Sequence, residues 1–253
     1  MKSWKFIAQS LFLMIFHLAG YSCLSQNSKS YSNQQWFQYY NQLVISNKYT
    51  LFTDAGFRTA DNISRFSQWL VRASLGYPIT KKLNGASGIA FFYHIGKGSN
   101  NVLEFRPFQE LNTEHSLWLS TIHHRFRTEA RIYRQNGSVI NRLQQQFDLR
   151  TRYRLLCNIP LLSIKTQKIS INVGNEFFYS FRLVPHKTPM LGNRMLLGVA
   201  GKTSKNITWS FTYNAQWNKM VNPDLIEKTD VVWIALTRRI ARVTNSRGLR
   251  TIN

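Results

Sequence analysis

Between Ile122 and Leu155 the sequence alternates between charged and apolar residues, and this period of two indicates extended strands. In the first part of the stretch the charge lies on the odd positions, which are His123, Arg125, Arg127, Glu129 and Arg131. After a short link that contains a glycine, the charge lies on the even positions, which are Asp148, Arg150, Arg152 and Arg154. Neighbouring residues of a strand point to opposite faces. The stretch therefore predicts two neighbouring strands, each with one charged and one apolar face.

The same period of two recurs along most of the chain. The clearest example runs from Ile207 to Trp217, where apolar and aromatic residues alternate with Thr, Ser, Asn and Gln. We recognise about eleven such segments of about 9–15 residues, close to the ~9–11 residues with which a tilted strand crosses a bilayer. Bacterial single-chain barrels usually have an even number of strands, so we expect about twelve strands, with ten as the alternative.

The predicted fold is all-β, a single antiparallel up-and-down transmembrane β-barrel. A closed sheet pairs every backbone N–H and C=O, which lipid requires. The apolar parity would then face lipid and the charged parity would face the lumen, with aromatic residues at the two membrane interfaces. The candidates for these interface positions are Trp36, Trp69, Trp209 and Trp217. The alternative is a soluble β-sandwich or lipocalin-like barrel, whose apolar parity would face inward.

The first 25 residues have the composition of a secretory signal peptide. Lys2 and Lys5 precede a mostly apolar stretch, and the small residues Ser22 and Ser25 come before Gln26. Acylation of Cys23 is the alternative, although a tyrosine stands nearby where a lipoprotein signal has a small residue. We therefore expect a signal peptide at 1–25, an outer-membrane barrel at 26–242, and a polar tail at 243–253. The expected location is the outer membrane, after removal of the signal peptide.

Basic residues outnumber acidic residues by 33 to 11, for a net charge of +22. Such an excess is typical of proteins that bind nucleic acid or an anionic surface. Much of this charge, however, lies inside alternating strand patterns, and the chain has no RNA-binding fingerprint and no zinc-ligand spacing, so we do not expect nucleic-acid binding. We expect no metal site either, because the adjacent His123 and His124 would point to opposite faces of one strand. No cofactor is expected.

The candidate site is the charged parity of the predicted strands. Seven of the eleven acidic residues fall within these strands, on faces that also carry arginine or polar residues. Carboxylates held among arginines predict a lumen network of bidentate ion pairs. Its expected members are Glu104, Arg106, Glu110, Arg125, Arg127, Glu129, Arg131, Asp148, Arg150, Arg152, Arg154, Glu176 and Arg194. Two interpretations stay open, a ring that selects anions and a polar filling of a narrow barrel.

Several motifs in order along the chain carry a resemblance to a known family. They are Glu104-Phe-Arg106-Pro-Phe-Gln109, Arg125-Phe-Arg127-Thr-Glu129-Ala-Arg131, Arg150-Thr-Arg152-Tyr-Arg154, Asn175-Glu176-Phe177 and Asn193-Arg194. In this order they resemble an uncharacterised family of bacterial outer-membrane β-barrel proteins, described only as a domain of unknown function. The resemblance implies an outer-membrane barrel with a charged interior, and it brings no activity or cofactor. The end of the chain, Thr251-Ile252-Asn253, departs from the common aromatic ending, so an assembly signal is expected earlier, near Trp233 to Leu236.

The sequence favours a non-enzymatic barrel, either a narrow anion-favouring channel or a structural envelope component with a charge-filled lumen. One alternative is a lipid-modifying barrel enzyme, for which His124 would be the candidate base, with no identifiable serine partner. Another is a soluble periplasmic β-sheet binding protein. The expected partners are outer-membrane lipid, lipopolysaccharide (through basic loops such as Lys81-Lys82), the barrel-assembly machinery and a small anionic solute.

Overall fold

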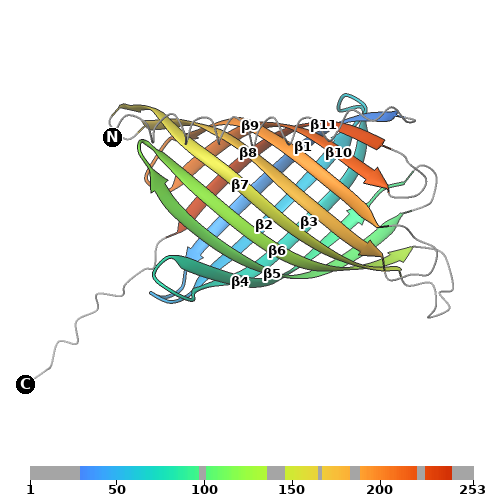
Figure 1. Cartoon of the computed structure of the whole chain (residues 1–253), viewed down its shortest axis with the longest axis horizontal. Coiled ribbons are helices and arrows are strands. Elements are labelled where there is room, and N and C mark those ends of the chain that lie inside the picture. Colours follow the sequence, from blue (N-terminus) through green and yellow to red (C-terminus); the bar gives the residue numbers. More distant parts are fainter. Residues whose placement is uncertain are drawn as a thin grey trace, which may run out of the picture.

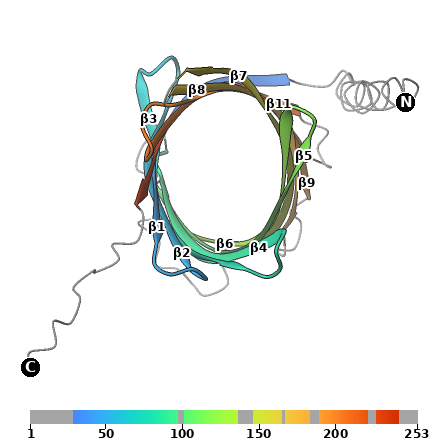
Figure 2. The same ribbon diagram turned by 90° about the vertical axis from the view of Figure 1, so that its left-hand side faces the viewer.

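The computed structural model describes residues 29–96, 101–135, 146–164, 167–182, 189–220 and 226–240. Within these ranges the chain forms eleven β-strands that close into one barrel (Figures 1 and 2). Over the same ranges there is no helix long and apolar enough to cross a membrane. The all-β barrel expected from the alternating pattern is therefore confirmed. The signal peptide expected at 1–25 and the polar tail expected at 243–253 lie outside the described residues.

The strands follow one another around the barrel in chain order. Their bounds are β1 Lys29–Val44, β2 Thr50–Ala60, β3 Arg65–Pro78, β4 Leu83–His94, β5 Val102–Leu117, β6 Ser120–Gln135, β7 Gln146–Ile164, β8 Gln167–Arg182, β9 Met190–Lys202, β10 Ile207–Met220 and β11 Ile226–Ile240. Each strand from β1 to β10 pairs antiparallel with the next one. The barrel is thus a continuous meander of eleven strands.

The barrel closes through a parallel pair, β1 with β11, in a register that runs from Lys29 opposite Ile226 to Leu43 opposite Ile240. Strands that alternate in direction bring the first and the eleventh to run the same way, so this last pair must be parallel. The expectation of about twelve strands, antiparallel throughout, differs from the structure in these two respects. Parallel strands also form a hydrogen-bonded ladder, so an odd number can close without a twelfth strand.

The two ends of the barrel carry connections of different length. At one end, which we call the short-turn rim, the connections β1–β2, β3–β4, β5–β6, β7–β8 and β9–β10 have two to five residues. At the other end, the long-loop rim, the remaining five connections have four to ten residues. Both β1 and β11 begin at the long-loop rim and end at the short-turn rim, because they run parallel.

The two faces of the sheet differ as the alternation predicts. The outer face exposes large apolar and aromatic side chains on every side of the barrel, among them Phe57, Trp69, Leu75, Ile89, Phe91, Phe126, Tyr153, Phe177, Phe211 and Ile234. The inner face holds the buried charged residues together with a few buried rings, Trp36, Phe92, Phe108 and Phe178. The barrel interior is therefore polar, with aromatic rings set among the charges.

Candidate functional site

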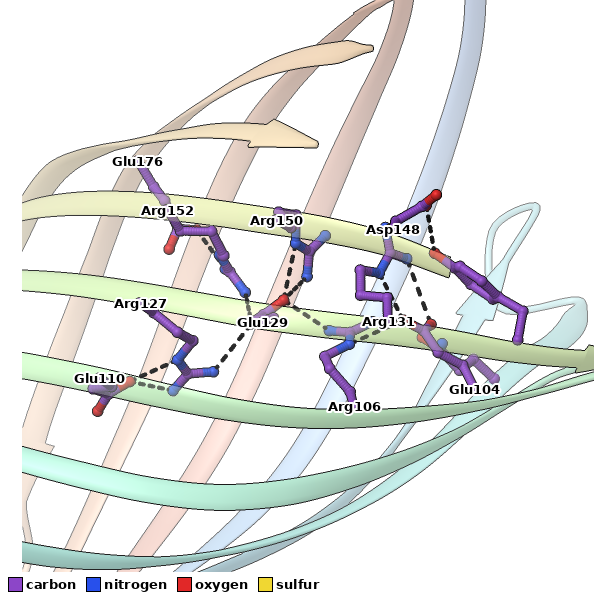
Figure 3. A network of polar contacts seen from close by, with 12 residues as sticks. Glu104, Arg106, Glu110, Arg127, Glu129, Arg131, Asp148, Arg150, Arg152 and Glu176 are labelled. Atoms are coloured by element: carbon purple, nitrogen blue, oxygen red, sulfur yellow. Dashed lines mark hydrogen bonds and ion pairs between the residues drawn. The ribbon is translucent and has the colours of Figure 1, made fainter. Parts of the chain in front are cut away.

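The register of β5 to β9 brings the charged positions of neighbouring strands side by side. On β6 and β7, Arg127 lies opposite Arg152 and Glu129 opposite Arg150. The register thus makes both kinds of neighbours: Arg150 bonds to Glu129 directly opposite it, whereas Arg127 and Arg152 are like charges that bond to carboxylates elsewhere on the inner face. All thirteen residues of the expected network lie on the inner face, and Figure 3 shows ten of them in contact.

Glu129 on β6 is the most heavily paired carboxylate, with no surface exposed to solvent. Arg150 donates from Nε to its Oε2 at 2.9 Å and makes a second contact through Nη2. Arg152 donates from Nη1 to Oε1 at 3.1 Å. Arg127 and Arg106 lie at 3.5 Å and 3.6 Å (Figure 3). One carboxylate thus serves four guanidinium groups.

Glu176 on β8 has a similar arrangement of arginine partners. It accepts hydrogen bonds from Arg125 at 2.6 Å, from Arg152 at 2.8 Å and from Arg194 at 2.9 Å. Arg152 therefore bridges Glu129 and Glu176. Such charge-assisted bonds fix the rotamers of long side chains that would otherwise be free.

Two further carboxylates on β5 complete the pairing. Glu104 is fully buried and accepts from Arg106 at 2.7 Å and 3.0 Å and from Arg131 at 2.6 Å. His94, from β4, lies with Nε2 2.8 Å from the same carboxylate. Glu110 accepts from Nε of Arg127 at 2.7 Å.

Asp148 on β7 is a weaker member of the network. It accepts a hydrogen bond from the hydroxyl of Tyr133 at 3.3 Å, and the nearest Arg131 nitrogen is 4.0 Å away.

The inner face also carries charged residues outside the expected network. Arg72 on β3 donates from Nε to Asp54 on β2 at 2.7 Å, and Gln38 on β1 donates to the other oxygen of Asp54 at 2.5 Å. Arg58 on β2 faces the same space. Their polar parity within alternating segments was a signal that could have found them, but small or apolar residues separate these charges, so that they do not form a continuous run as on β6 and β7.

One of the four expected interface aromatics lies inside the barrel, beside Arg58. Trp36, expected at a membrane interface, is only 6% exposed and lies inside the barrel. It shares the inward parity of Gln34 and Gln38, and the guanidinium of Arg58 stacks on its ring, 3.8 Å from the centroid. A cation over the face of an indole is attracted by the ring quadrupole, which favours the inward position.

The other three tryptophans lie on the outer face or at its margins. Trp69 and Trp209 are 39% and 38% exposed. Trp217 borders an outer-surface hollow with Phe126 and Phe177. Trp209 stands near the start of β10 at the short-turn rim, whereas Trp217 and Trp69 stand nearer the long-loop rim.

Two adjoining cavities occupy the lumen. The first, of about 410 Å³, reaches Gln34 and Gln68 toward the long-loop rim. The second, of about 540 Å³, reaches Lys48 and Pro78 at the short-turn rim. They share seven lining residues, which are Tyr40, Gln42, Phe52, Arg72, Arg125, Arg127 and Arg154. Unfilled space therefore extends along most of the barrel axis.

The wall of the first cavity is strongly one-sided in charge. Ten arginines line it, namely Arg58, Arg72, Arg106, Arg125, Arg127, Arg131, Arg150, Arg152, Arg154 and Arg194. Among the residues that the structure describes, Glu176 is the single carboxylate in that lining. Glu104 and Glu129 are fully buried behind the arginines that they pair with. An anion in the cavity thus meets guanidinium groups first, and a cation meets the same positive wall.

His124, the candidate base of a lipid enzyme, lies on the outer face of β6. Its Nδ1 is 2.7 Å from the hydroxyl of Tyr153, and its ring stacks on His115 with centroids 5.0 Å apart. Among the described residues, neither of these contacts is a serine or a carboxylate. The constellation of nucleophile, base and orienting acid is not assembled there.

Comparison with known proteins leaves the function open and settles the family. No curated protein and no solved structure matches the chain. A family model described as "Protein of unknown function (DUF2490)" matches residues 33–227, which covers most of β1, all of β2 to β10 and the whole charge network. The chain therefore belongs to the uncharacterised DUF2490 family.

Proposed function

We propose that this chain is a transmembrane β-barrel of the bacterial outer membrane, with a narrow lumen that favours small anions. Its strands have 11 to 19 residues, enough for a tilted strand to cross about 30 Å of hydrocarbon. The outer face carries exposed apolar and aromatic side chains from every strand, and a contiguous apolar surface of this kind is typical of a membrane or partner interface. Lipid is the solvent in which such a face is stable.

The observation that carries the anion preference is the lining of the first cavity, with ten arginines and one carboxylate. Six carboxylates lie within 4.0 Å of these arginines, and they are Asp54, Glu104, Glu110, Glu129, Asp148 and Glu176. Four positive charges therefore remain, since ten minus six is four. In a low-dielectric barrel such an excess raises the local concentration of anions.

The rims suggest an orientation for the barrel. In outer-membrane barrels the short turns face the periplasm and the longer loops face the cell exterior. On this rule Lys81 and Lys82, in the β3–β4 turn, face the periplasm. A contact with lipopolysaccharide is then made from the long-loop rim, and insertion by the barrel-assembly machinery proceeds from the short-turn side.

Cell fractionation tests the membrane location. The full chain should be recovered in the outer-membrane fraction, and its gel mobility should change on heating, since a closed sheet resists detergent until it is boiled. A soluble, heat-insensitive band would instead support the periplasmic binding protein.

Planar bilayers test the lumen. With the purified barrel and a KCl gradient, we expect small current steps. The reversal potential should lie toward the equilibrium potential of chloride. A bilayer that holds the protein but carries no current would identify a structural envelope component, whose charge network fills the lumen. A reversal potential that lies toward the equilibrium potential of potassium would contradict the proposal.

A further inference from the structure

The arginines that line the first cavity are unequally paired. Most of them bond to a carboxylate, as Arg150 and Arg152 bond to Glu129. Among the described residues, no carboxylate lies within 4.0 Å of the side chain of Arg58 or of Arg154. Both side chains line the first cavity.

Two other arginines and two aromatic rings surround the side chain of Arg58. Arg58 and Arg194 share the ring of Trp36, with guanidinium carbons 3.8 Å and 5.1 Å from its centroid. Arg58 and Arg106 share the ring of Phe92, at 5.9 Å and 3.8 Å. These neighbouring arginines repel Arg58.

The neighbours of Arg58 already use their donors. Arg194 gives Nη1 to Glu176 and both Nε and Nη2 to Gln216. Arg106 gives Nε and Nη2 to Glu104. Within the described part of the chain, Arg58 alone of these three arginines has no side-chain hydrogen bond.

Arg58 is half-buried, and a partly desolvated cation without a counter-ion is costly; the aromatic stacking on Trp36 offsets only part of that cost. A mobile anion in the cavity would supply the missing charge. Tyr40 on β1 lines the same cavity and lies within electrostatic range of both Arg58 and Arg154. Tyr40 thus offers a hydroxyl donor on the wall of the cavity that the two arginines also line.

We propose that Arg58, Arg154 and Tyr40 form a binding site for a small oxyanion of the phosphate type, inside the first cavity. The planar guanidinium fork matches two oxygens of a tetrahedral oxyanion, which a chloride ion does not offer. A volume of about 410 Å³ admits phosphate or a small phosphate monoester with its water, but no macromolecule. The proposal rests on the anion-favouring lumen and names its ligand class.

Inorganic phosphate, titrated into the purified full chain in detergent, tests the site. Ionic strength and pH are held constant with chloride, and the emission of the tryptophans reports binding, because Trp36 stacks on Arg58. We expect a saturable change, with half-saturation by phosphate at a concentration at least about tenfold lower than by chloride. Glycerol 3-phosphate, used as a second probe, distinguishes a site for esters from one for the free ion.

The variants R58Q and R154Q should each weaken phosphate binding about tenfold, and R58K should weaken it less, because it keeps the charge but not the fork. The matched control is R65Q, which removes an arginine that is paired with Asp61 at the long-loop rim, outside both cavities. Its binding curve should be unchanged. Removing an unpaired cation leaves no carboxylate without a partner, so both lumen variants should keep the heat-modifiable band.

Phosphate that binds no better than chloride, or binding retained in both R58Q and R154Q, would overturn the proposal. Its failure is separable from that of the channel. Anion-selective current without saturable phosphate binding removes this site alone. Saturable binding without current removes the channel and leaves a closed anion-binding chamber.

Discussion

At the scale of single residues, the stability of the lumen depends on each buried charge having a partner of opposite charge. Glu129 forms ion pairs with four arginines and is completely buried. Desolvation offsets much of the Coulomb gain of such pairs, so their presence alone is weak evidence for stability. Removing one member, however, leaves the others buried and uncompensated.

The substitution E129Q should therefore destabilise the barrel by about 3–5 kcal/mol. The control is E114Q, because Glu114 faces solvent near the end of β5, where it pairs with His123 at 3.3 Å. That change should cost less than about 1 kcal/mol. Urea unfolding of the detergent-solubilised barrel, followed by tryptophan emission, measures both. Equal losses of stability in E129Q and E114Q would mean that the ion pairs of Glu129 do not hold the network together.

At the scale of strands, close packing inside the barrel depends on glycines that face aromatic rings. On β9, a Cβ atom built at Gly192 would lie 2.0 Å from Cε2 of Phe178 on β8. Phe178 is buried and lies 5.8 Å from the guanidinium carbons of both Arg150 and Arg194, so the ring cannot move without disturbing the charge network.

The substitution G192A should accordingly destabilise the barrel by about 1–3 kcal/mol, the usual cost of overpacking. The double variant G192A/F178L should recover most of that loss, because the smaller side chain vacates the space. Unfolding midpoints of the single and double variants decide the point. If the double variant is no more stable than G192A alone, the clash with Phe178 is not the cause of the loss of stability.

The strand faces could be predicted from the sequence because a period of two is a local property. Which arginine meets which carboxylate could not, because register depends on turns and on irregularities such as the shift between Arg58 and Thr59. The inward position of Trp36 follows from its parity alone, yet its size and aromatic character favoured an interface. The parallel closure depends on whether the number of strands is odd, which no single segment encodes.

The seam between β1 and β11 can be tested by cross-linking. In the structure Tyr39 lies opposite Leu236, and both side chains are exposed on the outer face. The pair Y39C/L236C, in a C157S background, should form a disulfide on mild oxidation. The pair Y39C/I240C should not, because Ile240 lies opposite Leu43, four residues or about 13 Å along the strand. A twelfth strand between β1 and β11 would abolish the Y39C/L236C cross-link as well.

At the scale of the whole molecule, the barrel is asymmetric along its axis. Its two rims differ in the length of their connections, and the second cavity reaches the short-turn rim at Lys48 while the first points toward the other end. A solute that crosses the lumen would meet the arginine-rich first cavity from one side and the more mixed second cavity, with Asp54 and Glu110 in its wall, from the other.

The proposed orientation makes a direct prediction for intact cells. Single cysteines at Asn62, in the β2–β3 turn of the long-loop rim, and at Lys48, in the β1–β2 turn of the short-turn rim, differ only in the end of the barrel that they mark. A maleimide reagent too large and polar to cross the outer membrane should label N62C and spare K48C, since the longer connections face outward. After permeabilisation both should react, which controls for the accessibility of K48C. The opposite pattern would invert the barrel, and an anion entering from outside would then reach the mixed cavity before the arginines.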